Sequence, residues 1–491
     1  MLSINEIKYF IKDDKRSKYK AQAIEGNNYY NARHDISEYR IFYYDAKGNL
    51  KYDTSKSNVQ ISHAFFTELV DQQVQYLLSS DSPFVLSKDD DLQKELDLRF
   101  NNNQRFISEL SDVMTGAIVQ GSGYLYAYKD LHKKLKFKNA SSLGITEVSA
   151  ENAQDKKAHI IYYYNDRVMK NKRFVDIKRI QVWDDEQTYF YTDYNGKIEE
   201  DKDAEWNPRP HVIYRKSDGD DLYKNSLGYI PFFRLNNNNQ RLSGLAPIKG
   251  LIDDYDLMAC GLSNNIQDLV DGYIVVKGFK GDNLDEITTN LKRKKHIGVA
   301  ADGDLDIKTV NIPYEARRVK LDLDEKNIYR FGMGFNSAQL GDGNITNVVV
   351  KSRYALLDLK CNKFESQLRA FLESILEVVI DEINAEKETG FTIDDVYFKF
   401  EREVMTNAKD NAEIDDIKAR TKQTEISILL GLLDTLDDET VVSKICQVLD
   451  VDYDEVKSKL PKDDIEDATN LINLGDMINE RPTKGSAASG A

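Results

Sequence analysis

The stretch PIKGLIDDYDLMACGLSNNIQDLVD, residues 247–271, decides how this chain is built. Its apolar residues recur at spacings of three and four, which is the pattern of one face of an α-helix. Pro247 suits the first turn of such a helix, where no N–H is needed. The apolar face comprises Ile248, Leu251, Ile252, Tyr255, Met258, Leu262, Ile266 and Leu269. The residues that fall mainly off this face are Asp253, Asp256, Ser263, Gln267 and Asp271. The pattern predicts a helix of about 25 residues and roughly 37 Å.

The residues after this helix change to a strand-like pattern. YIVVKG (273–278) and DIKTVNI (306–312) are rich in β-branched side chains, and LDEITTNLKRKK (284–295) between them has a helical pattern. We therefore predict a compact insertion that ends near Pro313. A second helix is predicted over 314–330, and its many charged residues indicate that it is exposed or packs only through its neighbours.

A glycine-rich segment and a very long helix follow. Residues 332–347, GMGFNSAQLGDGNITN, show no periodicity, so we predict a flexible loop. Thr346 or Asn347 can cap the helix that comes next. Apolar spacings of three and four then continue almost to Asn384. Such a helix spans roughly 55 Å, which is longer than ordinary globular helices and indicates a strut in an assembly.

The part of the chain before about residue 242 mixes helical and strand patterns. Helices are predicted over 62–78 and 106–119. The alternating aromatic stretches YLYAY, HIIYYY, RIQVW, QTYFYT and HVIYR predict strands, and the turn residues in DYNGKI and DAKGNL predict hairpins. This part is therefore predicted to be an α+β domain with an antiparallel sheet, bounded by the polar run at 236–239.

The C-terminal part is predicted to be mainly helical. VYFKFEREV (396–404) alternates like a strand, and helices are predicted over 411–433, over 438–449 and from Tyr453. The chain then becomes acidic and ends in a polar tail. With 491 residues, and roughly 150 residues for each domain, about three domains are expected.

The charge balance bears on contact with DNA. The chain carries 67 Lys and Arg against 83 Asp and Glu, which gives a net charge of −16. Proteins that hold nucleic acid tightly present excess positive charge to phosphates, so a tight, sequence-specific DNA reader is disfavoured. A protein that DNA slides past is compatible with this balance, because a like-charged wall repels the DNA. Simple solubility is the alternative explanation.

Three cysteines, Cys260, Cys361 and Cys446, lie far apart in helical patterns. We interpret them as core residues of a protein kept in a reducing compartment. The N-terminal residues lack a signal-peptide core, and no run of about 18 apolar residues predicts a transmembrane helix. We therefore expect a protein that is made and kept in a cytoplasm.

No motif in the sequence calls for a catalytic site, a metal or a cofactor. There is no GxxxxGK[ST] phosphate loop, no HExxH and no GxSxG elbow. The stretch 302–313 begins like a calcium loop but has Ile307 at its sixth position and Pro313 at its twelfth, so we interpret its start as a turn. The protein is predicted not to be an enzyme.

One dense basic run occurs, at Lys292, Arg293, Lys294 and Lys295. A solvated helix face is one interpretation. An electrostatic contact with phosphate or with an acidic partner is the other, and composition does not separate the two.

Three stretches resemble the portal proteins of long-tailed phages of Gram-positive hosts. GNNYYNARHDI (26–36) is similar to a signature of that family, although Ala32 stands where the family usually has Gly. The residues that match this signature are Tyr29, Tyr30, His34, Asp35 and Ile36. Residues 227–278 resemble the family's most recognisable stretch, and 345–365 at the start of the long helix resemble a third. In the second stretch the matching residues are Pro231, Asn237, Ile252, Asp253, Tyr255 and Asp256.

The resemblance implies a multidomain, helix-rich α+β portal fold that assembles as a ring, usually of twelve subunits. Its implied parts are a wing (1–243 and 348–405), stem helices (244–272 and 314–331), a clip (273–313), a tunnel loop (332–347), a crown (406–465) and a flexible tail (466–491). Portal rings sit at one capsid vertex of the virion, after assembly in the host cytoplasm. No membrane contact is implied, and the ATPase of the packaging motor is a separate protein.

Partners and site residues follow from the same resemblance. Double-stranded DNA would pass through the channel, and the clip would face the terminase and then the head–tail adaptor. Major capsid and scaffolding proteins are further expected partners. The implied tunnel-loop residues are Gly334, Phe335, Asn336, Ser337, Gln339, Gly341, Asp342, Gly343, Asn344, Thr346 and Asn347. The stem residues that can touch phosphate are Arg317, Arg318, Lys320, Lys326 and Arg330, and the clip contacts are Lys292 to Lys295.

Two other interpretations remain open on the sequence. A minor head or scaffold protein could share only the helical stretch, and it would form no closed ring. A nuclease would cleave DNA with a metal, for which the sequence offers no ligand cluster.

Overall fold

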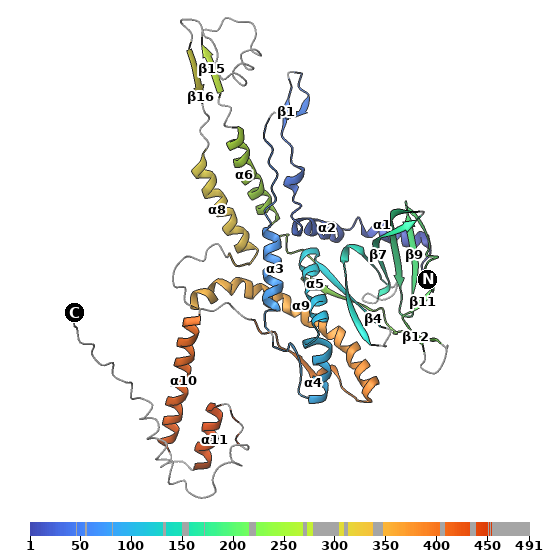
Figure 1. Cartoon of the computed structure of the whole chain (residues 1–491), viewed down its shortest axis with the longest axis vertical. Helices are drawn as coiled ribbons and strands as arrows, with labels where there is room; N and C mark the ends of the chain where they lie inside the picture. The colour runs from blue at the N-terminus through green and yellow to red at the C-terminus, as the bar shows by residue number, and fades with distance from the viewer. Residues whose placement is uncertain are drawn as a thin grey trace, which may run out of the picture. The chain divides into compact units, whose positions relative to one another are not determined.

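The computed structural model describes residues 1–45, 47–54, 56–80, 82–130, 134–149, 157–170, 172–215, 222–268, 273–277, 304–308, 313–336, 347–402, 408–432, 438–449, 451 and 453. The chain divides into two compact units. The first comprises Met1–Asn344 and Val348–Met405, and the second comprises Ile345–Asn347 and Thr406–Ala491. The first unit contains both helices and sheets, which confirms the α+β prediction (Figure 1).

Helices build the core of the first unit. α3 (Phe65–Leu77), α5 (Gln104–Gln120) and α9 (Asn347–Lys387) bury their apolar faces in one cluster. They confirm the helices predicted at 62–78, at 106–119 and after the glycine-rich loop. α9 has 41 residues and spans about 62 Å. Because it begins at Asn347, its capping position is 346, which lies outside the described residues.

Two N-terminal helices have no counterpart among the sequence predictions. α1 (Ile4–Asp14) starts with a capping box between Ser3 and Glu6, and α2 (Lys18–Tyr30) is capped by Ser17. α2 crosses α5 closely, because a Cβ on Gly26 would lie 2.0 Å from the Val119 carbonyl oxygen.

Antiparallel sheets complete the first unit. One sheet has the order β14 (Phe232–Asn236), β4 (Ser122–Lys129) and β5 (Leu135–Ala140). The larger one has the order β10 (Lys197–Glu200), β9 (Gln187–Tyr194), β8 (Arg173–Trp183), β7 (Lys157–Lys170) and β6 (Ile145–Ser149), with β11 (Arg209–Pro210) beside β9. β12 (Val212–Arg215) pairs with β13 (Leu222–Asn225). The predicted Asn-Gly hairpin joins β9 and β10, with φ of 51° at Asn195 and 82° at Gly196.

Two short pairings lie elsewhere in the first unit. β1 (Phe42–Tyr44) and β2 (Leu50–Tyr52) form the second predicted hairpin. β3 (Val85–Ser87), which precedes α4 (Asp90–Leu96), pairs with β17 (Val396–Phe398). Of the strand predicted over 396–404, β17 therefore covers the first three residues, whereas 399–402 are not in a strand and 403–404 lie outside the described residues.

The helix-and-insertion block is present as well. α6 (Lys249–Asp268) and α8 (Tyr314–Phe331) pack together, and β15 (Tyr273–Lys277) pairs antiparallel with β16 (Asp304–Lys308) between them in sequence. Residues 244–248 form turns, so α6 begins two residues later than predicted. The helix predicted at 284–295 lies outside the described residues.

The second unit is described at α10 (Ala408–Leu430) and α11 (Asp438–Leu449), which contact each other. The predicted helix at 411–433 is therefore displaced by three residues, and the one at 438–449 is confirmed. The helix expected from Tyr453 falls almost entirely outside the described residues. All three cysteines are buried and unpaired, as predicted.

Candidate functional site

α6 and α8, hereafter the helix pair, are joined by an ion pair, and both helices contribute residues to the main hydrophobic cluster: Ile252 from α6, Ile328 and Tyr329 from α8. Lys320 on α8 lies 2.5 Å from Asp254 on α6 and also pairs with Asp324 one turn further along α8. These hydrogen bonds raise the pKa of Lys320. The prediction that α8 is largely exposed is confirmed, since its buried residues are Asp324, Ile328 and Tyr329.

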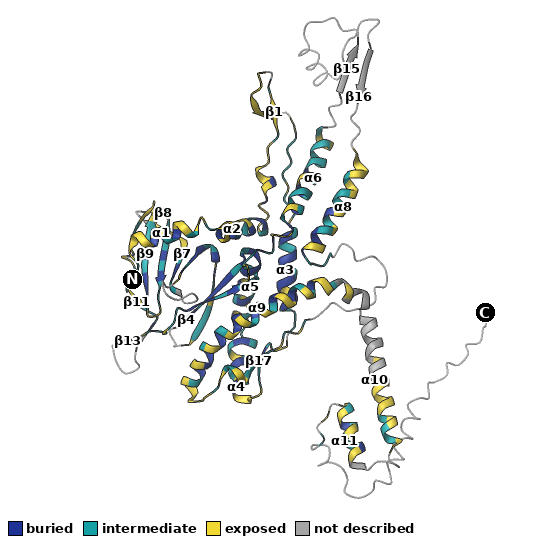
Figure 2. Ribbon diagram, turned by 180° about the vertical axis from the view of Figure 1, so that it is seen from behind, coloured by how far each residue is buried: buried dark blue, intermediate teal, exposed yellow. Residues whose placement is uncertain are grey.

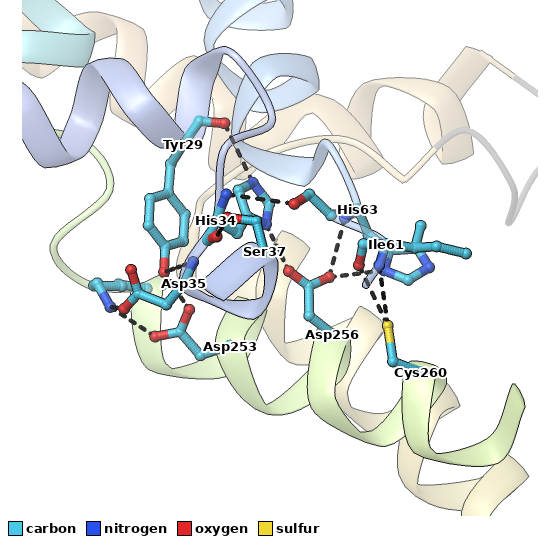
Figure 3. A network of polar contacts seen from close by, with 11 residues as sticks. Tyr29, His34, Asp35, Ser37, Ile61, His63, Asp253, Asp256 and Cys260 are labelled. Carbon is cyan, nitrogen blue, oxygen red and sulfur yellow. Dashed lines mark hydrogen bonds and ion pairs between the residues drawn. The ribbon is translucent and has the colours of Figure 1, made fainter. Parts of the chain in front are cut away.

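At the base of the helix pair, Asp256 is fully buried, at 0 % exposure. Figure 3 shows it in contact with His34 and His63. Its Oδ2 lies 2.6 Å from Nδ1 of His34, and its Oδ1 lies 2.7 Å from Nδ1 of His63. The backbone N–H of His63 donates to the same Oδ1 at 3.0 Å. Burial alone would raise the pKa of Asp256, but the hydrogen bonds from His34 and His63 outweigh it and lower the pKa. Asp256 is thus a carboxylate that ties two other segments to α6.

A second branch of this network lies one turn earlier on α6. The Tyr29 hydroxyl donates to Asp253, and the Tyr29 ring stacks on His34 with centroids 4.4 Å apart. Lys249 lies 2.7 Å from Asp35 and 2.8 Å from Asp253. Burial raises the pKa of Tyr29, and its hydrogen bond to Asp253 adds to that rise. Burial would lower the pKa of Lys249, but the two carboxylates raise it overall.

This network explains physically why two of the family-like stretches occur together. Tyr29, His34 and Asp35 come from one stretch, and Asp253 and Asp256 come from the other. His34 and Asp256 are 222 residues apart in the chain, yet they form one buried contact. The sequence placed Asp256 mainly off the apolar face and so missed its burial. His63, the third member, carried no signal in the sequence.

An extended segment, residues 57–63, lies along α6; we call it the strap. Every second backbone N–H of the strap donates to a side chain at every fourth position of α6. The pairs are Ser57 to Asp268, Val59 to Asn264, Ile61 to Cys260 and His63 to Asp256, at 3.0, 2.7, 3.3 and 3.0 Å. Two extended residues advance about 6.6 Å and four helical residues advance about 6.0 Å, so the two repeats stay in register over this length.

The first residues of the predicted tunnel loop are held in place. Phe335 donates its N–H to Gln72 at 3.0 Å and accepts from the Gln72 side chain at 2.7 Å, and its ring stacks on Tyr354. Asn336 donates to Glu325 at 2.9 Å. Gly334 has no room for a side chain, because a Cβ there would lie 2.0 Å from a buried Leu69 methyl. These contacts attach the start of the loop to α3, α8 and α9.

The other residues predicted to form the tunnel loop are either part of α9 or outside the described residues. Asn347 is the first residue of α9. The remaining ones lie outside the described residues: Ser337, Gln339, Gly341, Asp342, Gly343, Asn344 and Thr346.

The predicted phosphate contacts on α8 divide into two groups. Arg318 pairs with Glu315 at 3.1 Å, Lys320 is bound by two carboxylates, and Arg317 is half-buried beside Gly261 of α6. Lys326 and Arg330 are exposed and, among the described residues, form no ion pair. The basic run Lys292 to Lys295 lies outside the described residues.

The described residues contain no group of three or more His, Cys, Asp or Glu side chains placed to hold a metal ion. In the same part of the chain, no helix is both long enough and apolar enough to span a membrane.

Comparison with known proteins agrees with this architecture. The model of the family described as phage portal protein, SPP1 Gp6-like, matches residues 9–445. The chain therefore belongs to the phage portal protein family. Members of this family are structural components of the virion and subunits of a ring-forming head–tail connector, which supports the portal interpretation over a minor head protein or a nuclease.

Individual relatives are distant. The portal protein of Bacillus phage SPP1 is 26% identical over 379 residues, which cover 75% of this chain and 73% of that protein. The portal protein of Clostridium phage phiCD119 is 22% identical over 377 residues, covering 73% of this chain and 78% of that protein. A chain from the neck of an empty GTA particle, computed with C6 symmetry, aligns with a TM-score of 0.39 and 13% identity over 78% of this chain and 90% of its own length.

Proposed function

We propose that copies of this chain form the ring, usually of twelve in this family, through which a tailed phage packages and ejects its DNA. The observation that carries this proposal is the element order within the region matched by the family: α6, the insertion with β15 and β16, α8, the glycine-rich loop and α9. On this proposal the helix pair is the stem, residues 273–313 are the clip, and residues 1–243 and 348–405 are the wing. The tunnel loop is 332–347, the crown is 406–465, and 466–491 are a tail.

The subunit acts as a structural part and not as an enzyme. The terminase supplies the energy for packaging and docks on the clip, which the head–tail adaptor occupies afterwards. Major capsid and scaffolding proteins surround the ring. The protein is made in the host cytoplasm and ends at one vertex of the virion.

The basic residues of the proposed stem differ in how readily they could contact DNA phosphates. Lys320 and Arg318 are already paired with carboxylates, so they offer phosphates little free charge. Lys326 and Arg330 are exposed and unpaired among the described residues, which makes them the better candidates for weak, transient phosphate contacts.

Electron microscopy of the purified chain in negative stain tests the proposal directly. Closed rings with a central hole are the expected result. A chain that stays monomeric, or forms only open aggregates, at concentrations where related proteins assemble would refute the portal function.

Shortening the tunnel loop tests its role separately. Deleting 340–343 leaves the anchored residues Gly334, Phe335 and Asn336 in place, so rings should still form, whereas DNA packaging or retention should fall. A length-preserving control, Leu340→Ser with Asp342→Ser, should package better than the deletion. Loss of rings in the deletion would instead place the loop at a subunit interface.

A further inference from the structure

The β1–β2 hairpin, hereafter the arm, presents one apolar face that nothing in the described chain covers. In its register Phe42 lies opposite Tyr52, and Tyr44 lies opposite Leu50. Directly opposed residues point to the same side of a sheet, so these four side chains share one face. Their exposed fractions are 54%, 45%, 73% and 57%. Tyr43 and Lys51 occupy the other face, where Lys51 pairs with Asp45 at 3.1 Å.

Such a face is unusual for a subunit in isolation. Antiparallel sheets normally bury their apolar face on a core, and a lone two-stranded hairpin is only marginally stable. None of the four residues belongs to a hydrophobic cluster of the described chain. Figure 2 shows the arm as an exposed projection beside α6. Exposed apolar patches of this kind mark interaction surfaces.

The arm is nevertheless held at its base. The strap that leaves it is hydrogen-bonded along α6, and Asn58 and Gln60 donate to the Tyr39 carbonyl oxygen at 3.1 and 2.6 Å. At the inner end of the hairpin, Asp53 donates its N–H to Ile41 at 2.8 Å. Because the base is fixed before any partner arrives, less conformational entropy is lost when the arm is covered.

We propose that the apolar face of the arm packs against a second copy of this chain, so that each subunit of the ring reaches onto its neighbour. This inference rests on the proposed ring. A cyclic ring needs two different surfaces on every subunit, one that meets the preceding copy and one that meets the next. The arm supplies one of them.

The helix pair offers a counterpart on another surface. Val319 and Leu323 are 60% and 52% exposed. They are one turn apart on α8, about 100° around the helix from Asp324 and from Lys320, which pairs with Asp254 of α6. Ile266 and Tyr314, near the other end of the pair, are 56% and 54% exposed.

The exposed area of the four arm side chains is large enough to form part of an interface between subunits. The four arm side chains expose roughly 450 Å², given the 150–250 Å² that an aromatic side chain can bury. A stable interface buries about 800 Å² on each partner, so the arm supplies about half and other surfaces must supply the rest. A permanently neighbouring copy fits better than a transient partner, because the face would otherwise stay exposed in the assembled ring.

Photo-crosslinking in purified rings tests the proposal. Replacing Tyr44 by p-benzoylphenylalanine should give a ladder of covalent oligomers on a denaturing gel after irradiation. The matched control, the same replacement at Tyr43 on the opposite face, should give at most a tenth of that yield. Rings that form normally but give no oligomers from position 44 overturn the inference, while the portal function stands. A wild-type chain that forms no rings contradicts the portal function itself.

Assembly of variants gives a second measurement. Phe42→Ser, Tyr44→Ser and Leu50→Ser together should lower the fraction of rings at a fixed concentration at least tenfold. The circular-dichroism spectrum should be unchanged, because the arm contributes nothing to the described cores. Tyr43→Ser with Lys51→Ser is the control and should assemble normally. Rings from the triple variant at the wild-type level would refute the arm contact.

Discussion

Asp256 shows how a buried charge can hold distant segments together. An unpaired carboxylate in the interior costs several kcal/mol, so such a group is retained only when donors surround it. Here three donors do so, two imidazoles and one backbone N–H. Removing the carboxylate would leave His34 and His63 without their acceptor and would release the strap from the base of α6.

The sequence identified some of these residues but not their contact. Tyr29, His34, Asp253 and Asp256 stood out through resemblance, whereas the helical pattern placed Asp256 mainly off the apolar face. A hydrophobic pattern assigns every carboxylate to the surface. It carries no information on His34, the partner that lies 222 residues from Asp256 in the chain. His63 was missed for the same reason.

Replacing Asp256 by Asn should destabilise the first unit by about 2–4 kcal/mol at pH 7, since the amide keeps one acceptor oxygen for one histidine but sets its NH2 donor against the other. The folded-state pKa of Asp256 is lowered, so its contribution is complete above the unfolded value of about 3.9 and is lost as the pH falls through the folded-state value. The difference between the urea midpoints of wild type and variant should therefore be constant from pH 7 to about pH 4 and begin to shrink below it.

The exposed position 322 supplies the control for this experiment. Asp322→Asn should change the midpoint little at any pH, because Asp322 lies on the exposed side of α8. A wild-type advantage over Asp256→Asn that persists undiminished at pH 3 would contradict the role assigned to the ionised carboxylate.

Among the elements, those with long uninterrupted periodicity were predicted well. α6 begins two residues later than predicted, and α9 ends three residues beyond the predicted end at Asn384, because a repeated apolar face fixes a helix without reference to the rest of the chain. α1 and α2 were not predicted, and residues 399–402 of the predicted strand are not in a strand, because the end of β17 depends on its pairing with β3. The strap was not predicted either, since an extended segment whose N–H groups bind a distant helix has no local pattern.

The hydrogen-bond ladder of the strap can be tested one rung at a time. Asn264→Ala removes the acceptor of the Val59 N–H, and the loss of one net hydrogen bond of about 1 kcal/mol should speed amide exchange there about fivefold. Hydrogen-exchange mass spectrometry of peptides that span 57–63 measures this. Gln267→Ala, exposed on the same helix, is the control and should leave the exchange unchanged. Equal exchange in the two variants would refute the ladder.

At the scale of the whole molecule, the net negative charge is compatible with membership of the portal family. A channel that binds phosphate strongly would stall DNA, whereas a negatively charged wall repels it, so the net charge of −16 is compatible with the proposed passage of DNA. On α8, Lys320 and Arg318 are already paired with carboxylates. The proposed phosphate contacts are therefore limited to Lys326 and Arg330. The sequence could list these cations, but only the structure separates paired from free ones.

This distinction predicts different effects for charge reversal on α8. Lys326→Glu with Arg330→Glu should leave rings intact and lower packaging severalfold at low salt, with a smaller effect at high salt, because phosphate contacts are screened by ions. Arg318→Glu with Glu315→Arg keeps its local pair and should package at nearly the wild-type level. In vitro packaging at two ionic strengths measures both variants. If the Lys326 and Arg330 double variant packages like wild type at low salt, these side chains do not face the DNA, and the channel wall lies on another side of α8.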